Sequence, residues 1–285
     1  MSNNDRRPGP WDRPATPAAR SGTPPVPTPH AGQTDQEPSP VRGQHPAIAI
    51  GGTLLFAAFI SWISGSWIIA VALIFGLFVH EYGHVLAMNR LGMGPAKIYI
   101  IPFLGGLAAG QRAAASVWDG VVVSLAGPLF GLLATIPFLA AGMVLGDPAW
   151  LFGAFVIAMI NLINLAPAPP LDGAKALGPV LGRIHPRVEQ GAMLAIGAVV
   201  IVWALTRGSY IFGTFMVLAL FGHLRRGLRP HPGRPLTDRE TAMSIGLYLA
   251  TAAACVGAGL LPLVLLFGDP MQGMAGIAQW LGLSR

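Results

Sequence analysis

Charged side chains are scarce in this sequence: Lys, Arg, Asp and Glu together make up 11% of its 285 residues. Soluble domains carry about 25% charged residues, so the composition excludes an ordinary soluble domain and points to a membrane protein. Cysteine is almost absent as well. The one cysteine, Cys255, excludes an intramolecular disulfide, and its place in an apolar run predicts a small buried side chain.

Apolar residues are abundant instead, since they make up 53% of the chain and form several uninterrupted runs. About 20 apolar residues cross the hydrocarbon core of a bilayer as a helix. We therefore predict an all-α polytopic membrane protein with about seven transmembrane helices. Only Arg207 and Gly208 separate the fifth span from the sixth, which predicts a tight helical hairpin. The predicted spans lie near residues 47–63, 67–89, 117–145, 149–165, 190–206, 209–224 and 242–268.

The first 45 residues have a different composition. They are rich in Pro, Ser, Thr, Gly and Arg and contain almost no large aliphatic side chains. Such a segment cannot bury enough apolar surface to offset its ordering entropy, so we predict a disordered tail over residues 1–45. A cleavable signal peptide is not expected, because it would place its apolar region near the start, whereas the first apolar run begins near residue 47.

The basic residues predict an orientation in the membrane. The formal net charge is +6, which is compatible with nucleic-acid binding, but the positions of the charges favour another explanation. With a cytoplasmic N-terminus and alternation at each span, all of the 18 Lys and Arg residues except Arg207 and Arg285 lie on the cytoplasmic side. This asymmetry follows the positive-inside rule. We therefore expect a multi-pass protein of the cell membrane (plasma or inner membrane) with a cytoplasmic N-terminus, a basic cytoplasmic loop over residues 225–241 and no nucleic-acid partner.

One motif lies where ionisable side chains are costly. His80-Glu81-Tyr82-Gly83-His84 stands within the otherwise apolar run of residues 67–88. Ionisable residues at membrane depth are rare and usually functional. On a helix, His80 and His84 lie one turn apart on the same face, so both imidazoles can reach one zinc ion, while Glu81 can act as a base toward water. The pattern predicts hydrolytic zinc chemistry within a bilayer; the alternative is a pair of buried histidines with a structural role.

A zinc site of this kind needs a third protein ligand, and Asp172 is the candidate. It follows an apolar helix that is broken by three prolines within four residues, Pro167, Pro169 and Pro170. Broken backbone at membrane depth survives only where protein or a water-filled cavity satisfies it. We expect Asp172 to cap a new helix and point into a polar cavity; the alternative is an ordinary cytoplasmic turn with an N-cap Asp. Because the second and fourth spans run in the same direction, Asp172 and His80 come to a similar depth near the cytoplasmic face.

Together these motifs resemble the site-2 proteases, a family of intramembrane zinc metalloproteases. His80-Glu81-x-x-His84 is similar to the family's zinc-binding motif. Asn164-x-x-Pro167-x-Pro169-x-Leu171-Asp172-Gly173 is similar to its second signature. Between them, Ser124-Leu-Ala-Gly127-Pro128-Leu129 resembles a Gly-Pro motif of the third core helix, which is weakly specific alone. The similar core covers about residues 66–182, less than half of the chain.

The resemblance implies a role for each matching residue. Glu81 would act as the general base toward water and then return a proton to the leaving amine. Asn164 would hydrogen-bond the substrate backbone or the developing oxyanion. Asn161, one turn earlier, is interpreted as a neighbour in the polar network and not as a catalytic group. The implied ligands of one Zn²⁺ per chain are His80, His84 and Asp172.

The segment 97–110 is too short and too rich in glycine for a spanning helix. Its β-branched run followed by Gly105-Gly106 predicts a β-hairpin between the second and third spans. In the family this region is a membrane-dipping β-element, and a sheet edge there could hold an unwound substrate as an added strand. The alternative is an interfacial connector.

The resemblance also implies a domain organisation. Residues 46–224 would form a protease domain with six of the spans, followed by the basic loop at 225–241 and a last span with a short tail at 242–285. The chain leaves no room for a PDZ domain between the core helices, and the segment after the sixth span is too short for a pair of CBS domains. We therefore expect a compact form of the family.

The implied function is zinc-dependent intramembrane endoproteolysis, in which a peptide bond in or beside the transmembrane segment of another membrane protein is cleaved. The substrates that the resemblance implies are single-span membrane proteins such as anti-sigma factors or membrane-tethered regulators, or remnant signal peptides. The alternative from another class is a non-catalytic membrane zinc-binding protein or zinc transporter, which would have no need of Glu81. A membrane metalloprotease with Glu as third ligand is disfavoured, because no other predicted span contains a Glu.

Overall fold

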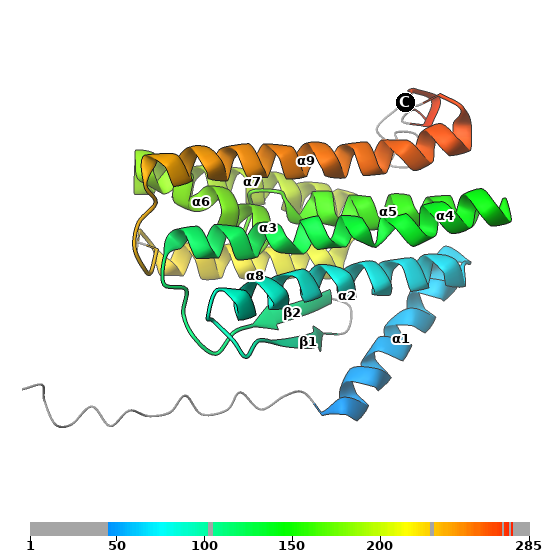
Figure 1. The fold of residues 1–285 in the computed structure, drawn as a ribbon, viewed down its shortest axis with the longest axis horizontal. Helices are drawn as coiled ribbons and strands as arrows, with labels where there is room; N and C mark the ends of the chain where they lie inside the picture. Colours follow the sequence, from blue (N-terminus) through cyan, green and yellow to red (C-terminus); the bar gives the residue numbers. More distant parts are fainter. Residues whose placement is uncertain (1–44, 102–104, 229–230, 270, 274, 276–285) are drawn as a thin grey trace, which may run out of the picture. The chain divides into compact units, whose positions relative to one another are not determined.

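The computed structural model describes residues 45–101, 105–228, 231–269, 271–273 and 275. The tail predicted over residues 1–45 lies outside the described residues, apart from residue 45. In the described part, the chain forms helices and one small sheet (Figure 1). The strands are β1 (Lys97–Ile101) and β2 (Gly105–Ala109). The helices are α1 (Pro46–Ser64), α2 (Trp67–Arg90), α3 (Val117–Leu133), α4 (Thr135–Leu145), α5 (Pro148–Asn164), α6 (Asp172–Ile184), α7 (Pro186–Thr206), α8 (Tyr210–Arg226) and α9 (Asp238–Phe267).

Long apolar helices confirm a multi-pass membrane protein. Within the described ranges, 5 stretches are long and apolar enough to cross a membrane: α1, α2, α3 continued by α4, α7, and α9. Helices α5 and α8 are also apolar but have 17 residues each. At about 1.5 Å per residue, such a helix is about 25 Å long, which is shorter than the hydrocarbon core of about 30 Å. The total of seven spans therefore stays a prediction.

Two helix connections can be compared with the sequence. The predicted hairpin at Arg207 and Gly208 is confirmed, since α7 ends at Thr206, α8 begins at Tyr210 and the two helices pack together. The predicted span 117–145 is divided, because α3 ends at Leu133 and α4 begins after Ala134. Pro137 explains the division: it has no N–H to donate to the carbonyl of Leu133, so the helical ladder is interrupted there.

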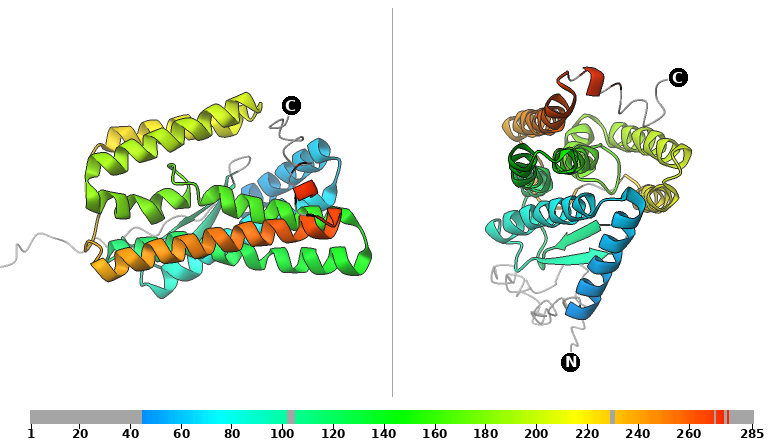
Figure 2. Two further views of the ribbon diagram at one scale, coloured as in Figure 1. Left: turned by 90° about the horizontal axis from the view of Figure 1, so that it is seen from above. Right: turned by 90° about the vertical axis from the view of Figure 1, so that its right-hand side faces the viewer.

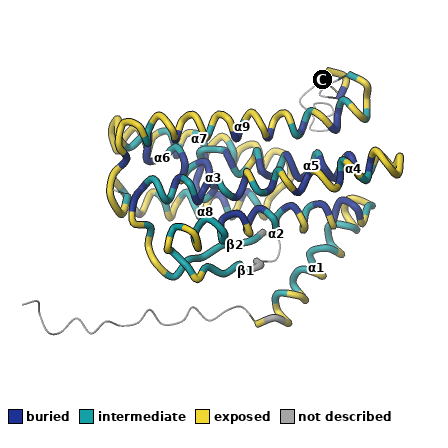
Figure 3. The backbone as a smooth tube through the Cα atoms, in the orientation of Figure 1, coloured by how far each residue is buried: buried dark blue, intermediate teal, exposed yellow. Residues whose placement is uncertain are grey.

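The central helices lie side by side. Helix α2 packs against α3 and α5, while α9 packs against α5, α3 and α6 (Figure 1). Two further views show that the α7–α8 pair lies next to α6, on the side away from α9, and that the sheet lies next to α1 and α2 (Figure 2). The buried residues concentrate along α2, α3 and α5, whereas the outer face of α9 is exposed (Figure 3). Helices α2, α3 and α5 therefore form the interior of the bundle.

Local capping explains where several of these helices begin. Ser116 and Asp119 form a capping box at the start of α3, in which each side chain accepts a hydrogen bond from the backbone N–H of the other. Asp147 accepts from the N–H of Ala149 at the start of α5. Thr237 and Glu240 form a second capping box at the start of α9. These polar caps fix the ends of helices whose interiors are almost wholly apolar.

The two strands of the sheet lie in the segment predicted to form a hairpin. They pair antiparallel, with Ile98 opposite Ala108 and Tyr99 opposite Leu107. The sheet contacts α2. That this sheet dips into the membrane stays a prediction.

Candidate metal centre

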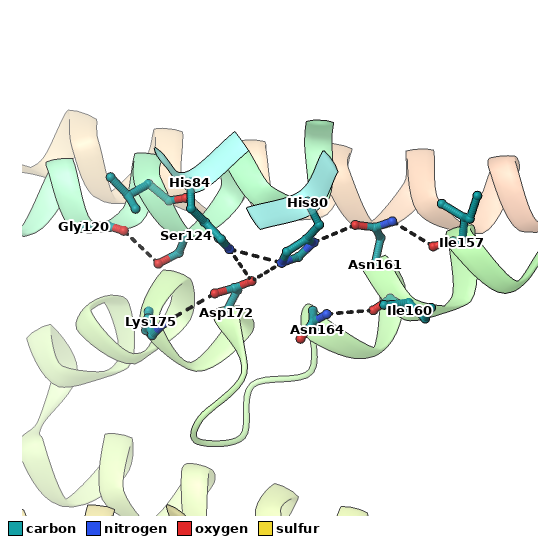
Figure 4. Close-up of polar contacts among 11 residues, drawn as sticks. His80, His84, Gly120, Ser124, Ile157, Ile160, Asn161, Asn164, Asp172 and Lys175 are labelled. Carbon is teal, nitrogen blue, oxygen red and sulfur yellow. Dashed lines mark hydrogen bonds and ion pairs between the residues drawn. The ribbon is translucent and has the colours of Figure 1, made fainter. Parts of the chain in front are cut away.

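Helix α2 presents two histidines to the interior. His80 and His84 are one turn apart, and their side chains are almost fully buried, with residue exposures of 2% and 6%. Their Nε2 atoms lie 3.1 Å from each other. The spacing predicted from sequence therefore places both imidazoles on the same face, with the same ring nitrogen of each pointing to one place (Figure 4).

Asp172 reaches this place from a different part of the chain. Helix α5 ends at Asn164, the proline-rich segment follows, and α6 begins at Asp172 itself. The Asp172 carboxylate is buried, and its Oδ2 lies 3.0 Å from His80 Nε2 and 3.1 Å from His84 Nε2. The expectation that Asp172 caps the helix is wrong: Leu171 is the N-cap residue, and no side-chain capping bond is made there. The carboxylate is directed at the histidines and not at the helix end.

Each imidazole is held by a hydrogen bond at its other nitrogen. His80 Nδ1 lies 2.8 Å from Asn161 Oδ1, and His84 Nδ1 lies 2.7 Å from the carbonyl oxygen of Val123. Because Asn161 donates its own Nδ2 to the carbonyl of Ile157, its Oδ1 faces His80 as an acceptor. Both Nδ1 atoms therefore carry a ring hydrogen, and in the neutral imidazoles that bind metals both Nε2 atoms present lone pairs.

The ring orientations and the spacing of these three side chains fit a bound metal ion. Two Nε2 lone pairs and a carboxylate oxygen face one another at 3.0–3.1 Å, which is electrostatically unfavourable unless a cation lies among them. In a tetrahedral zinc site with ligand distances of about 2.1 Å, neighbouring ligand atoms lie about 3.4 Å apart, close to these separations. In the described part of the chain, His80, His84 and Asp172 are the group of ligating side chains that could hold a metal.

Gly127 of α3 leaves room at this point. A methyl group on Gly127 would overlap His84 Nε2 and would lie 2.9 Å from His80 Nε2. The lack of a side chain therefore keeps the space beside both Nε2 atoms open. On the other side of the group, Lys175 Nζ lies 3.5 Å from Asp172 Oδ1, the carboxylate oxygen that does not face the histidines.

The site opens into a cavity of about 1050 Å³. Glu81 lines this cavity beside the histidines and is 8% exposed. It packs directly under β2, since a methyl group on Gly106 would overlap its side chain. Asn164 also lines the cavity, and its Nδ2 donates to the carbonyl of Ile160. The structure thus brings all five predicted site residues to one cavity.

Three further contacts of the site are only weakly indicated by the sequence. Asn161 was expected only in the polar network, and the structure shows its direct bond to His80. Gly127 was part of a motif with little specificity of its own. The Val123 carbonyl has no side-chain signature at all, so only the packing of α3 on α2 reveals it.

Comparisons with known proteins agree with this geometry. Residues 68–147 match the sequence model of peptidase family M50. This match confirms the resemblance to the site-2 proteases. It includes α2 with His80 and His84 and α3 with Gly127, and it ends before Asp172.

Two curated relatives carry related names. The chain is 29% identical over 141 residues to "Putative zinc metalloprotease sll0528" of Synechocystis sp., and this aligned region covers 47% of this chain and 36% of the relative. It is 31% identical over 144 residues to "Putative zinc metalloprotease Rip3" of Mycobacterium tuberculosis, and this aligned region covers 48% of this chain and 35% of the relative. The chain thus spans about a third of the length of these relatives. Both names describe these relatives as zinc metalloproteases.

Proposed function

We propose that this protein is a zinc-dependent intramembrane endopeptidase that cleaves a peptide bond in or beside the transmembrane segment of another membrane protein. The observation that carries the proposal is the convergence of His80, His84 and Asp172 at 3.0–3.1 Å, with the Glu81 carboxyl group beside them in the same cavity. A buried group of this composition inside apolar helices matches a metalloprotease centre.

In this proposal His80, His84 and Asp172 hold one zinc ion. When bound, zinc polarises the scissile carbonyl and lowers the pKa of water toward about 7. The Glu81 carboxylate takes a proton from the attacking water and delivers it to the leaving amine nitrogen. Asn161 and the Val123 carbonyl keep the two imidazoles oriented with Nε2 toward the ion.

Asn164 is proposed to bind the substrate backbone or the developing oxyanion. A side-chain amide has two N–H hydrogens, and the Nδ2 of Asn164 donates toward the carbonyl of Ile160. Its second hydrogen can therefore donate to a substrate oxygen without breaking that bond. The position of Asn164 on the cavity wall supports this role.

The substrate is proposed to lie along β2. Gly106, Leu107 and Ala108 of this strand line the cavity that contains the metal group. An extended segment added to this strand would pass over Glu81, because Gly106 packs directly on the Glu81 side chain. A helix must unwind before its peptide bond is cleaved, and an added strand would hold the unwound segment.

The proposed substrates are single-span membrane proteins such as anti-sigma factors or membrane-tethered regulators, or remnant signal peptides. The proposed location is the plasma or inner membrane, with a cytoplasmic N-terminus. The distribution of Lys and Arg supports this orientation. The exposed Lys175, next to the metal group, supports access of water to the cavity from the cytoplasmic side.

Glu81 separates this proposal from that of a non-catalytic zinc-binding protein. Among the residues that the structure describes, the group that could hold a metal does not include Glu81. Burying the Glu81 carboxyl group is costly, and this group lies beside the ligands without belonging to them. Such a placement is expected where a side chain transfers protons.

Asp172 provides a direct test of the metal group. Asp172→Ala removes one of three protein ligands, so we expect zinc affinity in purified protein to fall by more than about 100-fold, because loss of even an outer-sphere partner costs about 10- to 100-fold. Competition with a chelator, followed by elemental analysis, measures this affinity. Asp147→Ala, which removes an exposed carboxylate at the start of α5, is the matched control and should bind zinc like the wild type. Wild-type affinity of Asp172→Ala would remove Asp172 from the proposed ligands.

The two asparagines of α5 should give opposite results. Asn161→Leu removes the acceptor for His80 Nδ1, so we expect zinc affinity to fall about 10- to 100-fold. Asn164→Leu, one turn along the same helix, should leave zinc affinity unchanged and reduce kcat for a model transmembrane substrate. Wild-type zinc affinity of Asn161→Leu would contradict the proposed role of Asn161, and unchanged kcat in Asn164→Leu would contradict that of Asn164.

A further inference from the structure

The proline-rich segment that carries Asp172 leaves one buried carbonyl to be satisfied from outside. Leu165 is the residue that follows the last helical residue of α5, and it is 1% exposed. The last carbonyls of a helix have no partner within the helix, and Pro167, Pro169 and Pro170 have no N–H to offer. Because Leu165 is buried, bulk water cannot replace the missing donor.

Tyr248 of α9 supplies a donor to this carbonyl. Its hydroxyl donates to the oxygen of Leu165 at 2.5 Å, across 83 residues of sequence. The other hydroxyls buried on the same face of α9 behave differently. Ser244 donates to the carbonyl of Glu240 and Thr251 to that of Leu247, both within α9. Tyr248 therefore links α9 by a hydrogen bond to the start of the proline-rich segment, which we call the broken segment.

The Leu165 carbonyl touches the backbone next to Asp172. A methyl group on Gly173 would overlap the carbonyl oxygens of Leu165 and Ala166, so the start of α6 lies directly against this carbonyl. Leu165, Ala176 of α6 and Cys255 of α9 also belong to one buried apolar cluster, against which Tyr248 packs. The start of α6 is thus enclosed between α9 and the carbonyl that Tyr248 binds.

We infer that Tyr248 is a positioning residue, through which α9 fixes the broken segment so that Asp172 Oδ2 stays within reach of both histidines. This inference rests on the proposed metal group of His80, His84 and Asp172. It assigns a role in the site to a helix that lies outside both the proposed ligands and the matched family region. Tyr248 does not line the cavity of the proposed ligands, so it acts on them only through Leu165 and the start of α6.

Tyr248→Phe tests the inference, because it keeps the ring and removes only the hydroxyl. We expect the affinity of the purified, full-length protein for zinc to fall about 5- to 10-fold, the effect of losing one hydrogen bond to a buried carbonyl. With Co²⁺ in place of zinc, we expect a shifted or weakened visible absorption band, because the carboxylate ligand moves relative to the imidazoles. Ser244→Ala and Thr251→Val are the matched controls, since each removes a hydroxyl from the buried face of α9 without touching the break.

The outcomes separate this inference from the site on which it rests. Wild-type zinc affinity and an unchanged cobalt spectrum in Tyr248→Phe would overturn it, even where Asp172→Ala loses zinc. Equal losses in Tyr248→Phe, Ser244→Ala and Thr251→Val would also overturn it, because the effect would then be general loosening of α9. Wild-type affinity in Asp172→Ala would overturn the proposed metal group and this inference together. Loss confined to Tyr248→Phe and Asp172→Ala supports both.

Discussion

Replacing Glu81 with Gln is expected to abolish cleavage of a model transmembrane substrate while leaving zinc bound. Glutamine has nearly the same shape, so the packing of this side chain under Gly106 is kept. It cannot accept and return a proton, and positioned acid–base groups contribute about 10²- to 10⁴-fold to rates. We therefore expect kcat to fall at least about 100-fold with little change in zinc content. A cleavage assay in detergent or liposomes, with elemental analysis of the same preparation, measures both quantities.

Glu189→Gln is the matched control for this experiment. Glu189 lines the same cavity but accepts a hydrogen bond from His231 Nε2 at 2.8 Å, away from the metal group. The same chemical change there should leave most of the activity. Cleavage at the wild-type rate by Glu81→Gln would refute the proposed general base. Loss of zinc from Glu81→Gln would show that the side chain holds the site together and would leave its proton-transfer role unsupported.

Gly127→Ala is expected to have the second large effect, although it adds only one methyl group. That methyl would overlap His84 Nε2 and crowd His80 Nε2, the two atoms proposed to bind zinc. Overpacking a well-filled interior costs about 1–3 kcal/mol, which corresponds to a loss in zinc affinity of about 5- to 150-fold. Activity should fall in the same proportion when zinc is limiting, and added zinc should restore part of it.

A second glycine of α3 controls for the change in helix composition. Gly120 has nothing within 4 Å of a Cβ at its position, so Gly120→Ala adds the same methyl group to the same helix without a clash. We expect Gly120→Ala to bind zinc and cleave substrate like the wild type. Gly127→Ala with wild-type affinity and an unchanged cobalt spectrum would contradict the proposed position of the ion beside Gly127.

Much of the site could be predicted because local sequence determines it. The spacing of His80 and His84 gives a shared face on any helix, and three prolines predict a helix break on any apolar span. The direction of the predicted spans places Asp172 at a level similar to that of His80, and the 3.0 Å contact between the two side chains agrees with this. What the sequence did not determine is the direction of the Asp172 side chain, which points to the histidines and does not cap α6.

The remaining contacts depend on packing between distant segments. His80 and Asn161 are 81 residues apart, and His84 and Val123 are 39 residues apart, so no local period links them. The hydroxyl of Tyr248 could not be assigned either, because its partner is a main-chain carbonyl that every residue possesses. The extents of α5 and α8, in contrast, were predicted closely, since the expected spans at 149–165 and 209–224 nearly coincide with Pro148–Asn164 and Tyr210–Arg226.

The separation of the ligands along the chain has a consequence for synthesis. Asp172 follows His80 by 92 residues and His84 by 88 residues. At a translation rate of about 5–20 residues per second, a ribosome completes α2 on the order of 10 s before it has made Asp172. A nascent or truncated chain that ends before α6 carries only two of the three side chains. The three side chains are thus present together only after α1 to α5 have been made, so a chain that ends before Asp172 lacks one of the proposed metal ligands.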